Sequence, residues 1–131
     1  MGMNLILTRY TKLDELKYCE EKCKNLEVVE LTNDMYENLI CDSVGELDIC
    51  EDAGDTFYSQ KIVLNEKISK LIKRCTETSL SIIDKINNDN ISDKEKAENL
   101  DELRVVLNVR NLLKEKNTKY ANQDEIFIIV G

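Results

Sequence analysis

Between residues 64 and 86, apolar side chains recur at the spacing of one face of an α-helix. The positions are Leu64, Ile68, Leu71, Ile72, Cys75, Ile82, Ile83 and Ile86. A helix that ran without interruption over residues 56–86 would be roughly 45 Å long. A domain of this size has a radius of gyration of only about 14 Å. We therefore expect either a break near residues 76–79 or a helix that protrudes from the domain.

Three shorter apolar runs, at residues 4–9, 26–31 and 125–130, predict β-strands. Four consecutive polar residues at 87–90 predict a turn. Ser92 then starts a capping box, and a second apolar stripe predicts a long helix after it. These elements flank the stripe at residues 64–86 on both sides.

Three further segments have weaker patterns. Residues 11–14 resemble a capping box, and the apolar positions that follow predict a helix to about Lys24. Residues 34–44 predict a short helix. Residues 45–55 contain two glycines and five acids, which favours an irregular loop.

The predicted order of elements is β-α-β-α-α-α-β, without internal repeats. It indicates an α/β or α+β fold with a small three-stranded mixed sheet packed with three or more helices. The first β-α-β unit can be parallel with a right-handed crossover. The chain has no proline, so a proline-rich linker is absent, and we expect a single domain over residues 1–131.

Composition excludes several functions. The chain has no histidine, which removes imidazole acid–base catalysis and histidine metal ligands. The net charge of −8 argues against binding to nucleic acid or to an anionic membrane. No apolar run is long enough for a membrane span, and the N-terminus lacks a secretory pattern. Five cysteines, an odd count, indicate reduced thiols, so we expect a cytoplasmic protein.

The negative charge is concentrated in residues 25–60, which carry ten carboxylates and no lysine or arginine. We call this stretch the cation-free segment. Its charge is −10, and the rest of the chain, with 18 cations and 16 acids, is at +2. Such an asymmetry can select a basic partner surface.

The densest acidic cluster begins after Gly45 and ends just after Gly54, with the acids Glu46, Asp48, Glu51, Asp52 and Asp55. Carboxylates in this density can bind a divalent cation or serve as an acid–base pair. The spacing is not that of an EF-hand loop, and we predict no metal or other cofactor. The alternative is a solvated acidic loop.

Arg9 and Tyr10 directly follow the first predicted strand. Ligands often bind at the carboxyl ends of strands in open α/β sheets, so Arg9 is a candidate for holding an anion. No glycine-rich phosphate loop accompanies it. The alternative is an ordinary surface arginine.

Cys19 and Cys23 are one helical turn apart if residues 13–24 form a helix. Two thiolates at this spacing can share a soft metal, although a structural zinc site needs four ligands. The alternative is core packing, because free cysteine is among the most frequently buried residue types.

Both ends of the chain carry short motifs. It opens with Met1-Gly2-Met3 and closes with Lys119-Tyr120-Ala121 before a terminal apolar strand, and it also contains Leu47-Asp48-Ile49. In these motifs it resembles the YfbM-like family of bacterial domains of unknown function. The resemblance implies a single mixed α/β domain and no active site that can be carried over.

Three hypotheses about function follow. The absence of catalytic motifs favours a binding module over an enzyme, one that engages a basic protein partner as an immunity, antitoxin or phage-encoded inhibitor protein does. The alternative is a small-molecule or divalent-metal enzyme or sensor that uses residues 46–55, with Arg9. A third possibility is a homo-oligomer that pairs through the helix at residues 64–86.

Overall fold

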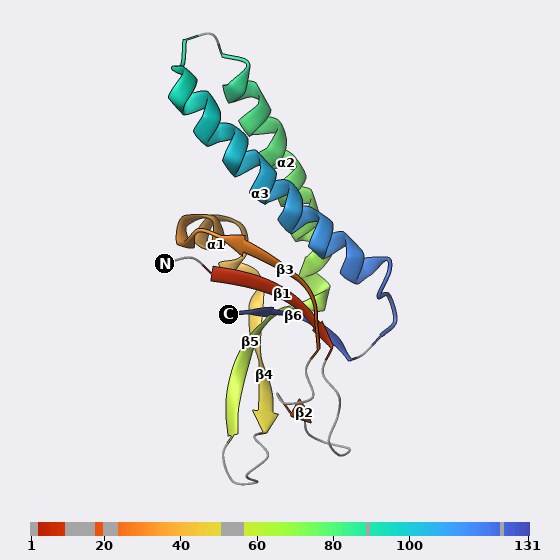
Figure 1. Cartoon of the computed structure of the whole chain (residues 1–131). Helices are drawn as coiled ribbons and strands as arrows, with labels where there is room; N and C mark the ends of the chain where they lie inside the picture. Colours follow the sequence, from red (N-terminus) through yellow and green to blue (C-terminus); the bar gives the residue numbers. More distant parts are fainter. Residues whose placement is uncertain (1–2, 10–17, 20–23, 51–56, 89, 124) are drawn as a thin grey trace.

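The structure is a computed structural model that describes residues 3–9, 18–19, 24–50, 57–88, 90–123 and 125–131. It has an α+β fold in which a curved sheet packs against a short helix and a long helical hairpin (Figure 1). The fold class agrees with the prediction from the sequence. None of the described helices is long and apolar enough to cross a membrane.

The sheet is larger than the predicted three strands. Its strands in chain order are β1 Met3–Arg9, β2 Tyr18–Cys19, β3 Lys24–Leu31, β4 Val44–Cys50, β5 Phe57–Val63 and β6 Ile126–Val130. Their order across the sheet is β2-β4-β5-β6-β1-β3. All neighbours are antiparallel except the two-residue β2, which pairs parallel with β4.

The three predicted strands, at residues 4–9, 26–31 and 125–130, are confirmed as β1, β3 and β6 and lie side by side. They pair antiparallel, so the prediction that the first two strands form a parallel β-α-β unit was wrong. The helix predicted at residues 11–24 is contradicted where the structure describes it, because Tyr18, Cys19 and Lys24 are in strands.

The predicted loop at residues 45–55 is wrong up to residue 50, because these residues form β4 and pair with β5. Gly45 pairs with Ile62 and makes no turn. A Cβ atom at Gly45 would lie 2.6 Å from Cδ2 of Leu64, so the glycine makes room for this leucine. Residues 57–63, predicted to start the long helix, form β5 instead.

A short helix, α1 Asn33–Leu39, follows β3 directly. Thr32 caps it by accepting a hydrogen bond from the Met35 amide at 3.2 Å. A 3₁₀ turn, η2 Cys41–Ser43, continues it into β4. The helix predicted at residues 34–44 is therefore confirmed in its first half and ends earlier than expected.

The two long helices are α2 Ile68–Ile86 and α3 Asp93–Asn117. They pack as an antiparallel hairpin that projects well beyond the sheet (Figure 1). The predicted break at residues 76–79 does not occur. The hydroxyls of Thr76 and Ser79 donate to the carbonyl oxygens one turn before them, at 3.1 and 2.8 Å, so the polar residues fit within the helix. The predicted N-cap at Ser92 is confirmed, since its Oγ accepts from the Glu95 amide.

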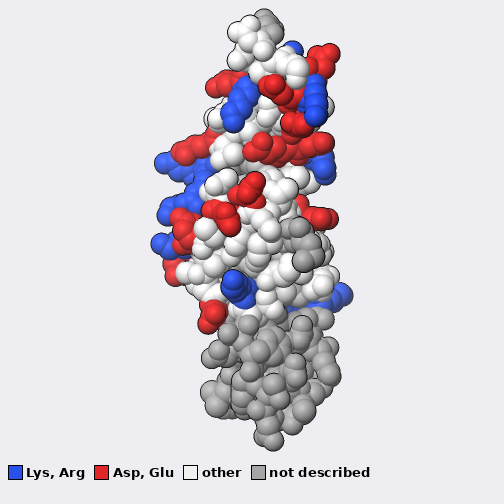
Figure 2. Space-filling view, turned by 90° about the vertical axis from the view of Figure 1, so that its left-hand side faces the viewer, with Lys and Arg blue, Asp and Glu red and all other residues white. Residues whose placement is uncertain are grey.

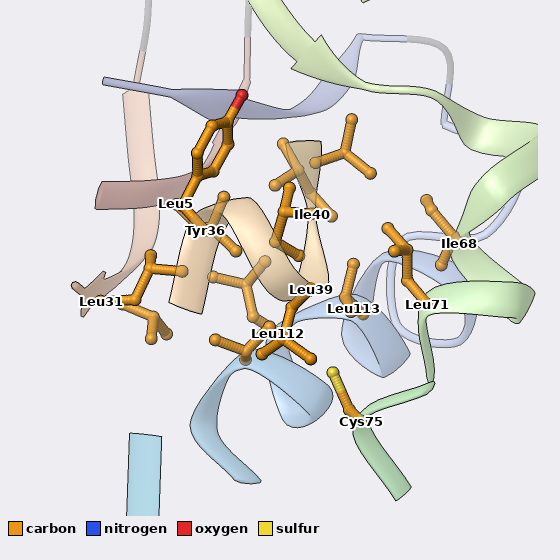
Figure 3. Close-up of a cluster of buried hydrophobic side chains, with 14 of the residues drawn as sticks. Leu5, Leu31, Tyr36, Leu39, Ile40, Ile68, Leu71, Cys75, Leu112 and Leu113 are labelled. Atoms are coloured by element: carbon orange, nitrogen blue, oxygen red, sulfur yellow. The ribbon is translucent and has the colours of Figure 1, made fainter. Parts of the chain in front are cut away.

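The core lies between one face of the sheet and the helices (Figure 3). Leu5 and Leu31 come from the sheet, and Leu112 and Leu113 come from α3. Tyr36, Leu39 and Ile40, in and just after α1, fill the space near them. The stripe predicted at residues 64–86 is mainly internal, because Ile68, Leu71, Cys75 and Ile82 are buried. These buried members of the stripe stabilise the fold, and pairing between subunits through this helix stays a prediction.

Candidate functional site

The acidic cluster predicted from the sequence is only partly described. Glu46 is an exposed residue of β4, and Asp48 lies on the same strand. Glu51, Asp52 and Asp55 lie outside the described residues. In the part of the chain that is described, no three Cys, Asp or Glu residues gather into a group that could hold a metal ion.

Arg9 lies at the end of β1, and Tyr10 is outside the described residues. Nη2 of Arg9 donates to Oε1 of Gln123 at 3.1 Å, which links β1 to the segment after α3. Its Nε atom is buried without a hydrogen-bond partner among the described residues. Cys19 lies in β2 and Cys23 is not described, so the thiol pair stays a prediction.

A groove lies between strand β3 and helix α3. Its volume is about 870 Å³, which falls within the range of small-ligand and peptide sites. The strand wall is formed by residues 27–32. The helix wall is formed by Arg104, Val105, Asn108 and Asn111. We call this feature the β3–α3 groove.

Strand β3 is the last strand of the sheet on this side, and its outer edge carries unpaired backbone groups. Asn4 exchanges both backbone hydrogen bonds with Gly131, at 2.8 and 2.9 Å, so it faces β6. Successive residues of a strand alternate in direction, so Leu5 and Leu7 face β3 and pair with Val29 and Glu27. The backbone N–H and C=O groups of Val28 and Glu30 consequently point outward along the free edge.

The helix wall of the groove is polar where it faces away from the core. Val106, Val109 and Leu113 are fully buried on one side of α3. Arg104, Asn108 and Asn111 are exposed and line the groove. Their spacing of four and three residues places them in one row along the helix. Amide and guanidinium groups therefore stand opposite the free edge of β3.

The groove carries charges of both signs. Glu27 on β3 is hydrogen-bonded to Glu115 on α3. This hydrogen bond, together with partial burial and repulsion by the Glu115 carboxylate, raises the pKa of Glu27, and Lys119 offsets part of the effect. The helix wall also carries a cation, Arg104, eleven residues before Glu115 on α3. A pair of acids held close together is a place where an added cation would be stabilised.

The described acids of the cation-free segment are spread over more than one strand of the sheet. On the face shown in Figure 2, acidic and basic side chains are interspersed along the projecting hairpin. Glu27 and Glu30 belong to this segment and lie at the groove, whereas Glu46 lies on β4 at the far side of the sheet order.

Sequence reasoning identified none of the helix residues of this groove. The available signal was the polar row Arg104, Asn108 and Asn111 on a helix with an otherwise apolar inner side. That signal did not indicate which strand the row would face. No family model, no curated protein and no solved structure matches this chain. The likeness to the YfbM-like family thus stays a prediction from the sequence.

Proposed function

We propose that this protein is a binding module that holds an extended segment of a basic protein partner in the β3–α3 groove. The observation that carries the proposal is the free edge of β3 beside a groove of about 870 Å³. An extended peptide that joins an exposed sheet edge gains main-chain hydrogen bonds, and neighbouring pockets provide selectivity. The role would be immunity-like or inhibitor-like, because blocking a partner requires binding and no chemistry.

The backbone supports this binding mode. The outward N–H and C=O groups of Val28 and Glu30 can form a ladder with a partner strand. The amides of Asn108 and Asn111 stand across the groove, and each offers a donor and an acceptor to the other side of a bound segment. Val28 is 52% exposed, and a partner strand would cover it.

The charges support a basic partner. Glu27 contributes to the strand wall, and the neighbouring Glu115 adds a second carboxylate. A lysine or arginine placed beside Glu27 and Glu115 would relieve their mutual repulsion, because it stabilises both charged forms. Charges at the rim of an interface mainly raise the association rate, so binding should weaken with added salt.

The test uses a fluorescent peptide of alternating valine and lysine as the probe and measures its binding by anisotropy. The deciding variant is Val28→Pro, which removes one outward N–H without touching the ladder to β1. Its matched control is Val28→Thr, which keeps both the β-branched shape and the N–H. We expect Val28→Pro to weaken binding roughly tenfold or more and Val28→Thr to change it little.

Two further measurements separate the backbone from the charges. The amide resonances of Val28 and Glu30 should shift when the peptide binds. A peptide of alternating valine and glutamate should bind more weakly than the lysine peptide. Equal binding by the wild type and the folded Val28→Pro variant would refute strand addition at β3, and equal binding of the two peptides would refute selection for basic partners.

A further inference from the structure

Five large apolar side chains are exposed among the described residues, and four of them lie on the projecting hairpin. Leu80 is 59% exposed and Ile83 is 40% exposed on α2. Leu100 is 54% exposed and Leu107 is 41% exposed on α3. Exposed apolar residues that occur singly need no explanation, but a group on one surface indicates an interaction site.

These four residues lie on the same side of the hairpin. Nε of Arg110 on α3 donates to Oγ1 of Thr76 on α2 at 2.7 Å, which fixes how the two helices face each other. Leu107 lies three residues before Arg110, and Leu80 lies four residues after Thr76. Residues at these spacings are neighbours on a helix surface. The hydrogen bond therefore joins the row that contains Leu80 to the row that contains Leu107.

The exposed row on α3 has a strict seven-residue repeat. Asp93, Leu100, Leu107 and Lys114 follow one another at intervals of seven, and all four are exposed. A seven-residue repeat keeps its members on one seam when two helices pack together as a coiled coil. We call these four residues the α3 seam.

The α3 seam is complementary to itself in one orientation. When two copies of α3 pack antiparallel about a point between Leu103 and Arg104, Leu100 of each copy meets Leu107 of the other. The same arrangement places Asp93 of each copy opposite Lys114 of the other. A parallel arrangement would place like charges together at both ends. Charge complementarity therefore selects the antiparallel pair.

We propose that the α3 seam docks on the α3 seam of a second copy of this chain, forming an antiparallel two-fold dimer. Leu80 and Ile83 of α2 lie beside the seam and add apolar surface to the contact. The seam is roughly 31 Å long at 1.5 Å per residue. Because the hairpin projects beyond the sheet, antiparallel docking places the two sheets at opposite ends (Figure 1).

The first test measures the molar mass of the full chain by sedimentation equilibrium over a range of concentrations, without any peptide. We expect a reversible dimer in the wild type. Leu107→Glu should weaken it by roughly tenfold or more, as expected for a residue near the centre of an interface. The matched control is Val28→Glu, which places the same charge at an exposed apolar residue away from the hairpin. A wild type that stays monomeric, or equal dissociation by both variants, would overturn the proposal.

The second test uses charge. Asp93→Lys gives a seam with cations at both ends, and Lys114→Asp gives one with acids at both ends, so each variant alone should be mainly monomeric. A mixture of the two should restore a dimer that contains one copy of each, which native mass spectrometry can identify. Glu98→Lys, on the opposite side of α3, is the charge-matched control for Asp93→Lys and should remain a dimer.

Circular dichroism checks that each variant folds. The mixture contains the same two substitutions as the separate variants, so a dimer that forms only in the mixture reflects charge pairing and not a change in folding. If the mixture stays monomeric while both variants are folded, the antiparallel seam is wrong. Val28→Pro is expected to lose peptide binding and to keep the dimer. Failure of the groove proposal and failure of the dimer proposal are therefore distinguishable.

Discussion

Arg74 in α2 donates to both carboxylate oxygens of Asp42, at 2.8 and 3.0 Å. The same guanidinium donates to the carbonyl oxygen of Leu39, the last residue of α1, at 2.8 Å. Ser43 adds a hydroxyl donor to Asp42 at 3.0 Å. One arginine thus ties the end of α1 and the turn after it to the helical hairpin.

The ion pair predicts how stability changes in acid. The hydrogen bonds from Arg74 and Ser43 hold the pKa of Asp42 well below its usual value. A carboxyl with a lowered pKa in the folded state contributes stability above its unfolded pKa, and that contribution is lost as the pH falls through the folded pKa. Asp42→Asn should therefore be less stable than the wild type at neutral pH, with a difference that shrinks in acid below about pH 4. Urea unfolding at several pH values measures this difference.

The control for this prediction is Arg74→Lys, which keeps the charge but lacks the planar two-point geometry. We expect it to lose part of the stability that Arg74→Met loses. The hydrogen bond to the Leu39 carbonyl alone is worth about 1 kcal/mol. A pH-independent difference between Asp42→Asn and the wild type would contradict the role assigned to the carboxylate.

The Glu27–Glu115 pair predicts a dependence of stability on pH that is opposite to that of Asp42. The raised pKa of Glu27 means that its ionised form is less favourable in the folded state. That cost is absent below the unfolded pKa and grows as the pH rises towards the folded pKa. Glu27→Gln should therefore be more stable than the wild type near neutral pH and equal to it in acid. Thermal unfolding across this range of pH is the measurement.

An NMR titration identifies the cause of that shift. In Glu115→Gln, the pKa of Glu27 should move down towards its ordinary value, because the hydrogen bond with the Glu115 carboxyl and the repulsion by its charge are both removed. Glu30→Gln is the comparison, since Glu30 lies on the same strand but does not take part in the pair. An unchanged Glu27 titration in Glu115→Gln would rule out the pair as the source.

The core predicts that alanine substitution lowers the free energy of unfolding far more at one leucine of the helical hairpin than at another. Leu112 is fully buried on α3, and Leu80 is 59% exposed on α2. Leu112→Ala should cost about 2–5 kcal/mol of unfolding free energy, because it leaves a cavity that the neighbours fill only in part. Leu80→Ala should cost no more than about 0.5 kcal/mol. Denaturant titrations of the two variants are to be compared at a concentration where both are monomeric.

The two described free cysteines should react at very different rates. Cys75 is 1% exposed, and burial raises the pKa of its thiol to about 11. Cys41 is exposed, and its Sγ atom donates to the Glu37 carbonyl at 2.9 Å. Iodoacetamide labelling followed by peptide mass spectrometry should modify Cys41 in the native protein and Cys75 only after denaturant is added. Rapid native labelling of Cys75 would show that the hairpin opens.

Local patterns in the sequence identified most of the helical structure. The stripe around Leu71 and the capping serine Ser92 predicted α2 and α3, because a helix forms its hydrogen bonds within one segment. The alternative of a protruding helix was correct, since α2 and α3 project beyond the sheet (Figure 1). Strands β1, β3 and β6 were recognisable from their apolar runs.

The β4–β5 pair was missed for a physical reason. Its hydrogen bonds join two segments, so neither segment shows the pairing by itself. Two glycines and several acids around Asp48 suggested a loop, but Gly45 is needed for contact with Leu64. The hypothesis that the acids of residues 46–55 bind a cation stays a prediction, because most of that cluster lies outside the described residues.

The sequence by itself determined the two long helices, the three apolar strands and the concentration of acids in residues 25–60. It also contains the seven-residue repeat from Asp93 to Lys114, although only the burial of the helices shows that this row is exposed. The tertiary structure alone decided that β3 is an edge strand and that Asn108 and Asn111 face it. The reason is that local hydrogen bonding and periodicity are properties of one segment, whereas an edge and a groove exist only once distant segments have packed together.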